Sequence, residues 1–163
     1  MSRLARLLAG IVVVALGCAV WFGVETGLLD SGDNAALVDQ TATAEVTEQV
    51  GAAVKAVFSY DYANLARTER AAAEVLAGDA VAQYRDQFAA ARKRAEEQKL
   101  VRTTTVRSLG VRELRGDDAS VLLFLDQQTL APGGGAPQTS VAQLSVTAKR
   151  VDGRWRLSRL DTL

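Results

Sequence analysis

An uninterrupted apolar run near the N-terminus constrains this chain more than any other feature. From Leu7 to Val24, eighteen consecutive residues carry no charge, a length at the lower end of the range for a transmembrane helix. Arg3 and Arg6 precede the run, and Glu25 follows it. Because basic residues favour the cytoplasmic side of a membrane, we expect a single span with a cytoplasmic N-terminus and an extracytoplasmic C-terminal domain.

Two alternatives for the same segment stay open. A signal peptide would combine the N-terminal arginines, the apolar run up to Leu16, and the small residues Gly17 and Ala19. Cleavage there would leave a mature chain that begins with a second apolar stretch, so the uncleaved span is favoured. Attachment of a lipid to Cys18 would need a lipobox, and ALGC at 15–18 is a poor one, because the chain continues apolar beyond the cysteine. As the only cysteine, Cys18 also excludes an intrachain disulfide.

The length leaves room for one domain of ordinary size behind this segment. We expect residues 1–25 to form a cytoplasmic stub and the transmembrane helix. Residues 26–43 are predicted to be a juxtamembrane break and a helical stalk, since TGLLDSGD at 26–33 contains two glycines and polar residues. Residues 44–163 would form the extracytoplasmic domain, which is large enough to bury a core without disulfides or metals.

Helical spacing predicts three helices in the first part of this domain. Asp33 is a candidate cap for a helix over 34–58, whose second half places four valines on one stripe: Val46, Val50, Val54 and Val57. Asn64 would cap a second helix that Gly78 ends. Asp79 would cap a third helix over 79–99. Its apolar face is Val81, Tyr84, Phe88, Ala91 and Ala95, with Arg92–Glu96 and Lys93–Glu97 pairs opposite.

β-branched and alternating residues predict four strands after the third helix, over 101–114, 119–130, 140–151 and 154–160. Gly110 is expected to form a bulge in the first strand. The apolar centre of the second strand indicates that both of its faces are covered. A glycine-rich loop at 131–137 and the pair Asp152-Gly153 supply turns. Three helices followed by four antiparallel strands predict an α+β fold, with the helices on one side of a curved sheet.

This order resembles the cone-shaped SnoaL-like fold, and the chain is similar in particular to the Mce-associated membrane proteins of actinobacteria. The resemblance rests on Phe58-Ser59-Tyr60-Asp61-Tyr62, on Ala77-Gly78-Asp79, and on the closing segment Arg150-Val151-Asp152-Gly153-Arg154-Trp155-Arg156-Leu157. It implies a non-enzymatic accessory subunit that binds or stabilises an Mce-type system for importing lipids or sterols across the cell envelope. The implied partners are the membrane and the protein subunits of that transporter. The family brings no catalytic residues.

Composition argues against most kinds of chemistry. The chain has no histidine, which removes the commonest general base and metal ligand, and its 19 basic and 19 acidic residues balance. Arg92-Lys93-Arg94 is too short for a nucleic-acid surface and is neutralised by Glu96-Glu97. The glycines at 133–135 do not open a helix, so they form no phosphate loop. We therefore expect no catalytic, cofactor-binding or metal-binding residues, and no cofactor.

Two residue groups are candidate sites, and each gives an alternative function. Asp126 with Tyr60, Tyr62 or Tyr84 could abstract a proton in an isomerase or dehydratase, although a strand-end aspartate facing water is favoured. The cluster Tyr60-Asp61-Tyr62 could line a lipid pocket or meet a partner, although closing a helix end is favoured. The leading hypothesis is an assembly subunit, followed by a lipid-binding domain with an apolar pocket, and then by the enzyme.

Overall fold

The computed structural model describes residues 34–133 and 135–163, and Asn34–Leu163 form one compact unit with its own hydrophobic core. The predicted span and both of its alternatives lie outside the described residues, as does the predicted break at 26–33. Among the helices that are described, none is long and apolar enough to cross a membrane. The boundaries proposed between stub, stalk and domain stay a prediction.

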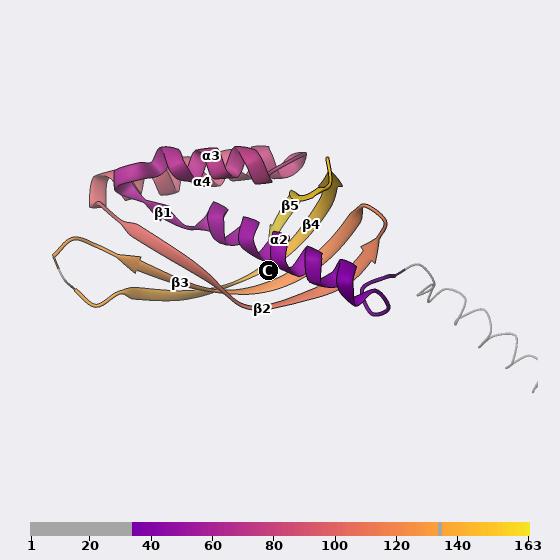
Figure 1. Ribbon diagram of the computed structural model, residues 1–163. Helices are drawn as coiled ribbons and strands as arrows, with labels where there is room; N and C mark the ends of the chain where they lie inside the picture. Colours follow the sequence, from indigo (N-terminus) through magenta and orange to yellow (C-terminus); the bar gives the residue numbers. More distant parts are fainter. Residues whose placement is uncertain (1–33, 134) are drawn as a thin grey trace, which may run out of the picture. The chain divides into compact units, whose positions relative to one another are not determined.

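The described part combines three α-helices with a five-stranded antiparallel sheet (Figure 1). The helices are α2 (Gln40–Phe58), α3 (Leu65–Val75) and α4 (Asp79–Gln98), and a short 3-10 helix, η1 (Tyr62–Asn64), precedes α3. The strands lie in chain order: β1 (Tyr60–Asp61), β2 (Val101–Arg115), β3 (Asp118–Leu130), β4 (Gln138–Val151) and β5 (Arg154–Thr162). The α+β class and the four long strands are confirmed, and β1 is an addition.

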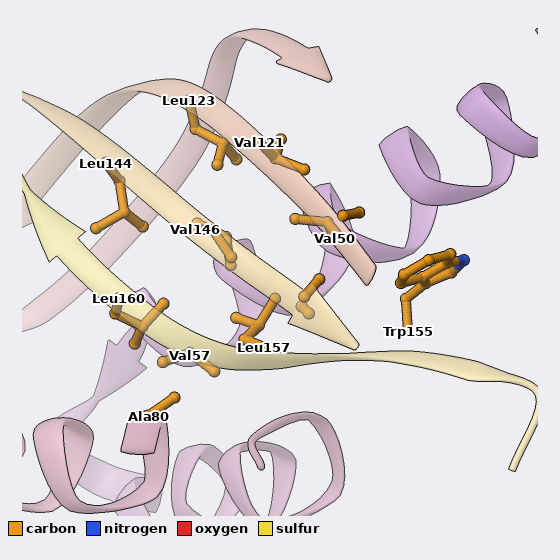
Figure 2. Packing of buried hydrophobic residues seen from close by; sticks show 14 of the residues in the cluster. Val50, Val57, Ala80, Val121, Leu123, Leu144, Val146, Trp155, Leu157 and Leu160 are labelled. Atoms are coloured by element: carbon orange, nitrogen blue, oxygen red, sulfur yellow. The ribbon is translucent and has the colours of Figure 1, made fainter. Parts of the chain in front are cut away.

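The core lies between α2 and the sheet. Helix α2 packs along β2 and against β5, while α3 packs on α2 and α4 packs on β5. The predicted valine stripe of α2 is confirmed, since all four side chains are at most 2 % exposed. Figure 2 shows side chains of this stripe facing those of β3, β4 and β5. The alternation of β4 is also confirmed, with Leu144, Val146 and Ala148 buried.

Helix α2 begins at Gln40 rather than at Asn34, and its cap is Asp39 instead of Asp33. The Asp39 carboxylate accepts a hydrogen bond from the Ala42 N–H at 2.9 Å. The helix does not start earlier because Asn34 is engaged with β2. Its Oδ1 accepts from the Leu114 N–H at 2.9 Å, and its Nδ2 donates to a β2 carbonyl at 3.0 Å.

Gly78 does not end the second helix. Helix α3 stops at Val75, and the next residues run extended beside β5, where the Ala77 N–H donates to the Leu157 carbonyl at 2.8 Å. Gly78 is instead the N-cap of α4, at φ 52°, a left-handed conformation that favours glycine. Asp79 consequently lies in the first turn of α4 and caps nothing. The predicted Asn64 cap of α3 is confirmed.

Two bulges bend β2, and neither is at Gly110, which pairs regularly with Leu122. The register shifts fall at Arg107 and Arg112, between Val106 and Ser108 and between Val111 and Glu113. Their cause is the spacing of the inward residues of β2. Four apolar residues of β2 each pair with an inward residue of β3: Val106, Leu109, Val111 and Leu114. Two of the three intervals between them are odd, and in a regular strand an odd interval places the two side chains on opposite faces. An extra residue in each odd interval restores the inward direction.

The expectation that both faces of β3 are covered is wrong. Val121, Leu123 and Leu125 are buried on the helix side, whereas Phe124, which points to the opposite face, is 36 % exposed. The helices therefore cover one face of the sheet only. Strand β5 ends the sheet, and helix side chains satisfy part of its free edge. The Gln49 Oε1 accepts from the backbone N–H of Trp155, and the Gln83 Oε1 of α4 accepts from the backbone N–H of Leu160, each at 2.9 Å.

Candidate functional site

Two cavities meet at a pair of stacked aromatic rings on α4. Tyr84 and Phe88 lie one helical turn apart, with ring centroids 4.8 Å apart and ring planes inclined by 15°. Both rings line both cavities. The amphipathic face of α4 that the sequence predicts therefore does more than fill the core, because its two aromatic members form a shared wall.

The first cavity, here called the helix groove, lies between α3 and α4 and has a volume of about 340 Å³. Its wall is largely apolar and includes Ala72, Leu76 and Val81. Its charged residues are Glu69, Arg85 and Arg92. Arg92 forms an ion pair with Glu69 and a second one, at 3.2 Å, with a glutamate one turn further along α4. The charges at this cavity thus include both signs, and most of them are paired.

The second cavity, here called the sheet-side pocket, lies between α4, the C-terminal end of α2, and strands β1, β2 and β5. Its volume is about 200 Å³. Apolar side chains form most of its wall: Val57, Phe58, Phe88, Ala91 and Leu160. Its charged residues are Arg94 and Arg102, and no carboxylate lines it. The two cavities therefore share their aromatic wall but differ in their charged residues, since the helix groove has both signs and the sheet-side pocket has positive charge alone.

Local structure fixes Arg102 at this pocket. The residue lies opposite Tyr60 in the β1–β2 pair, and its guanidinium lies over the Tyr60 ring, 5.3 Å from the centroid. Its Nε donates to the Thr129 hydroxyl at 3.1 Å. Neither Arg102 nor Arg94 forms an ion pair with any residue in the described part of the chain. Both guanidinium groups keep hydrogen-bond donors free.

The Tyr84 hydroxyl is the unusual polar group of this region. It is buried and has no hydrogen-bond partner among the described residues. Burial raises the pKa of the phenol well above its usual range, and the negative charge of Glu69 raises it further. Tyr84 therefore stays protonated at physiological pH and presents an unused hydrogen-bond donor.

The catalytic pair considered from the sequence is not assembled. The Asp126 carboxylate points away from the core and forms a half-exposed ion pair with the Arg107 Nε at 3.3 Å. Asp126 lines neither cavity, whereas Tyr84 lines both. Among the described residues there is also no cluster of three potential metal ligands.

The cluster Tyr60-Asp61-Tyr62 has mainly the structural role that was favoured. Tyr60 is buried in β1, where it also lines the sheet-side pocket. The Asp61 carboxylate accepts from the Ala63 N–H at 2.9 Å and caps η1. Tyr62 is 39 % exposed. One member of the cluster thus reaches a pocket, as the lipid-binding alternative requires.

Arg94 and Arg102 were missed as site residues by the sequence interpretation. The predicted pairs Arg92–Glu96 and Lys93–Glu97 are confirmed, at 3.2 and 3.9 Å. Arg94 belongs to the same run of charged residues but forms no such pair, because the positions four residues before and after it are Ala90 and Gln98, which carry no carboxylate. That missing i±4 partner was the available signal. Arg102 carried none, because its place depends on pairing with β1.

Comparison with known proteins adds three results, on family models, on sequence relatives and on solved structures. No family model matches the chain. Two curated proteins of Mycobacterium tuberculosis, both named as uncharacterized (MT1407 of strain CDC 1551 / Oshkosh and Rv1362c of strain H37Rv), are each 33 % identical over 106 residues. The match covers 64 % of this chain and 48 % of each relative, so the chain spans about half the length of the curated relatives it matches.

The fold is shared with several solved structures. An IcmL-like type IV secretion system protein of Legionella pneumophila superposes with a TM-score of 0.62 and 10 % identity, over 76 % of this chain and 92 % of that one. The periplasmic domain of DotI gives 0.60 and 12 %, over 77 % and 98 %. The intermembrane space region of the chloroplast protein ARC6 gives 0.50 and 16 %, over 76 % and 96 %. At these identities the likeness concerns the fold alone.

Proposed function

We propose that this protein is a non-enzymatic accessory subunit that assembles with, or stabilises, an Mce-type lipid or sterol import system in the cell envelope. The observation that carries the proposal is the match of the described domain to almost the whole DotI periplasmic domain, at a TM-score of 0.60. The sequence supports it independently, because an apolar run with basic residues before it favours a tethered extracytoplasmic domain. Two proteins that share the fold are named as a type IV secretion system protein and as a periplasmic domain, which agrees with an envelope role.

The Mce assignment and the SnoaL-like cone rest on the sequence resemblance around Phe58–Tyr62 and Arg150–Leu157. The two relatives come from Mycobacterium tuberculosis, which agrees with a resemblance to an actinobacterial family, and both are named as uncharacterized. A non-enzymatic role fits the separation of Asp126 from the tyrosines, since general acid–base chemistry needs both groups within hydrogen-bond reach of one substrate.

Co-purification from the native host tests the assembly role. The tagged full chain is extracted in mild detergent, and the captured proteins are quantified by mass spectrometry. We expect transporter permease and substrate-binding subunits of the Mce type to be enriched over a matched, tagged single-span protein. Recovery of the full chain alone, with no transporter subunit above that control, would contradict the proposal.

Labelling of the C-terminus tests the topology. A cysteine placed at Leu163, which is 72 % exposed, is offered a membrane-impermeant maleimide in intact cells, with Cys18 replaced by serine. We expect labelling before lysis, because the domain would lie outside the cytoplasm. Labelling only after lysis would place the domain on the cytoplasmic side and remove the basis for an envelope role.

A further inference from the structure

We propose that the sheet-side pocket binds a single-chain amphipathic carboxylate, with Arg94 and Arg102 holding the head group and the apolar wall receiving the adjoining carbons. The inference goes beyond the assembly role and does not depend on it. It follows from three features of the pocket: the sign of its charge, its apolar wall and the buried hydroxyl beside it.

The charge of the pocket selects an anion. Two guanidinium groups line it, and neither has a carboxylate partner in the described part of the chain. The helix groove provides an internal comparison, since Arg92 is there paired with Glu69. Guanidinium groups bind carboxylates through paired, charge-assisted hydrogen bonds. Arg102 is held in place by Thr129 and the Tyr60 ring, so little freedom is lost when it binds.

The wall and size of the pocket select a slender apolar body. Valine, phenylalanine, alanine and leucine side chains surround the space, so a chain of methylene groups would lose contact with water there. The volume of about 200 Å³ is below the ~300–1,000 Å³ of sites for drug-sized ligands. The pocket therefore accepts a head group with a short chain, or the first part of a longer one.

Tyr84, which lines the same pocket, carries a third hydrogen-bond donor, its hydroxyl. It is buried without a partner in the described part of the chain. An unpaired buried donor is costly, so each one in a native structure calls for an explanation, and a bound acceptor is one such explanation. An oxygen of a bound head group would satisfy it, and a bound cation or hydrocarbon would not.

Titration with probes of matched chain length tests the choice of head group. The protein is a fragment over residues 34–163, which contains the whole compact unit and its core. Octanoate, 1-octanol and octyltrimethylammonium are each titrated into it below their micelle concentrations, and binding is followed by NMR. We expect saturable octanoate binding with shifts at the side chains of Arg94, Arg102 and Tyr84. The alcohol and the cation should bind at least tenfold more weakly.

Arginine variants test the location. Arg94→Gln and Arg102→Gln should each weaken octanoate binding by about tenfold, since each removes a charge-assisted contact. Arg85→Gln is the matched control, because Arg85 lies on the same helix but lines only the helix groove, and we expect less than a twofold change. Should Arg102→Gln fail to fold, Arg102→Lys keeps the charge and should weaken binding only about threefold.

Three outcomes would overturn the proposal: absence of saturable octanoate binding, equal binding of all three probes, or equal losses in Arg94→Gln and Arg85→Gln. None of them depends on a transporter, because the fragment is studied without other proteins. A negative result here leaves the co-purification result unchanged, and failure of co-purification leaves the octanoate result unchanged.

Discussion

Replacing Tyr84 by phenylalanine should make the free domain more stable, which is the opposite of what most buried substitutions do. The change removes one hydroxyl that is buried and unpaired in the described part of the chain, and it keeps the ring that stacks on Phe88 at 4.8 Å. Burying a hydroxyl without a hydrogen bond costs about 1–3 kcal/mol in mutational series. Because the residue is only partly buried, we expect a gain of about 1 kcal/mol.

Urea unfolding of the 34–163 fragment measures this gain. With m-values of about 1–3 kcal/mol/M for small domains, the midpoint should rise by roughly 0.5 M while m stays unchanged. Tyr62→Phe is the control, because Tyr62 is 39 % exposed and its hydroxyl is not among the buried, unpaired polar atoms of the described residues. It should leave the midpoint where it is. If Tyr84→Phe lowers the midpoint instead, the hydroxyl is satisfied in the folded state and the inference of an unused donor is wrong.

Three further predictions concern stability. Burial in the folded state raises the pKa of Tyr84 above the unfolded value of about 10. Folding therefore opposes ionisation of Tyr84, and the free energy of unfolding decreases as the pH rises above 10. Urea midpoints should fall more between pH 9 and 11 in the wild type than in Tyr84→Phe. Gln83→Met should lower the free energy of unfolding by about 1–2 kcal/mol, because it removes the acceptor of the buried Leu160 backbone N–H in β5. The control Gln87→Met, at an exposed position four residues further along α4, should lower it by less than ~0.5 kcal/mol. Asn34→Ala should cost about 1–2 kcal/mol in thermal unfolding, because its side chain makes three hydrogen bonds to backbone groups, and an unchanged melting temperature would show that the α2–β2 link is dispensable.

Local pattern was sufficient for the elements whose residues face one continuous core. The stripe Val46–Val57 and the alternation of β4 could be predicted because period 3.6 and period 2 are visible in the sequence itself. The bulges of β2 were equally visible in the odd spacings of its apolar residues, whereas the presence of a glycine predicted a bulge at Gly110, where none occurs. A rule based on residue type failed there, and a rule based on facing direction would have succeeded.

Choices between equivalent local signals needed the tertiary structure. Asp33, Asn34 and Asp39 are all good helix caps, and the start of α2 is decided by Asn34 bonding to Leu114, eighty positions away. The sheet-side pocket is beyond local pattern for the same reason. Arg94 belongs to a helix and Arg102 to a strand, and they share a wall only because α4 packs over that end of the sheet. Sequence reasoning could show that Arg94 lacks a partner, but not what it faces.

The Tyr84 hydroxyl ties the stability argument to the binding argument through one measurable quantity. If a carboxylate oxygen accepts from this hydroxyl, the free domain bears the cost of an unpaired donor and the bound domain does not. A ligand at 100 times its Kd adds about 2.7 kcal/mol to the stability of whatever form it binds. Under this proposal Tyr84→Phe should bind octanoate more weakly, so it should gain less stability at the same octanoate concentration. The stability advantage of Tyr84→Phe should therefore shrink as octanoate is added, and it should vanish near saturation. An advantage that stays constant would mean that the ligand does not contact the hydroxyl.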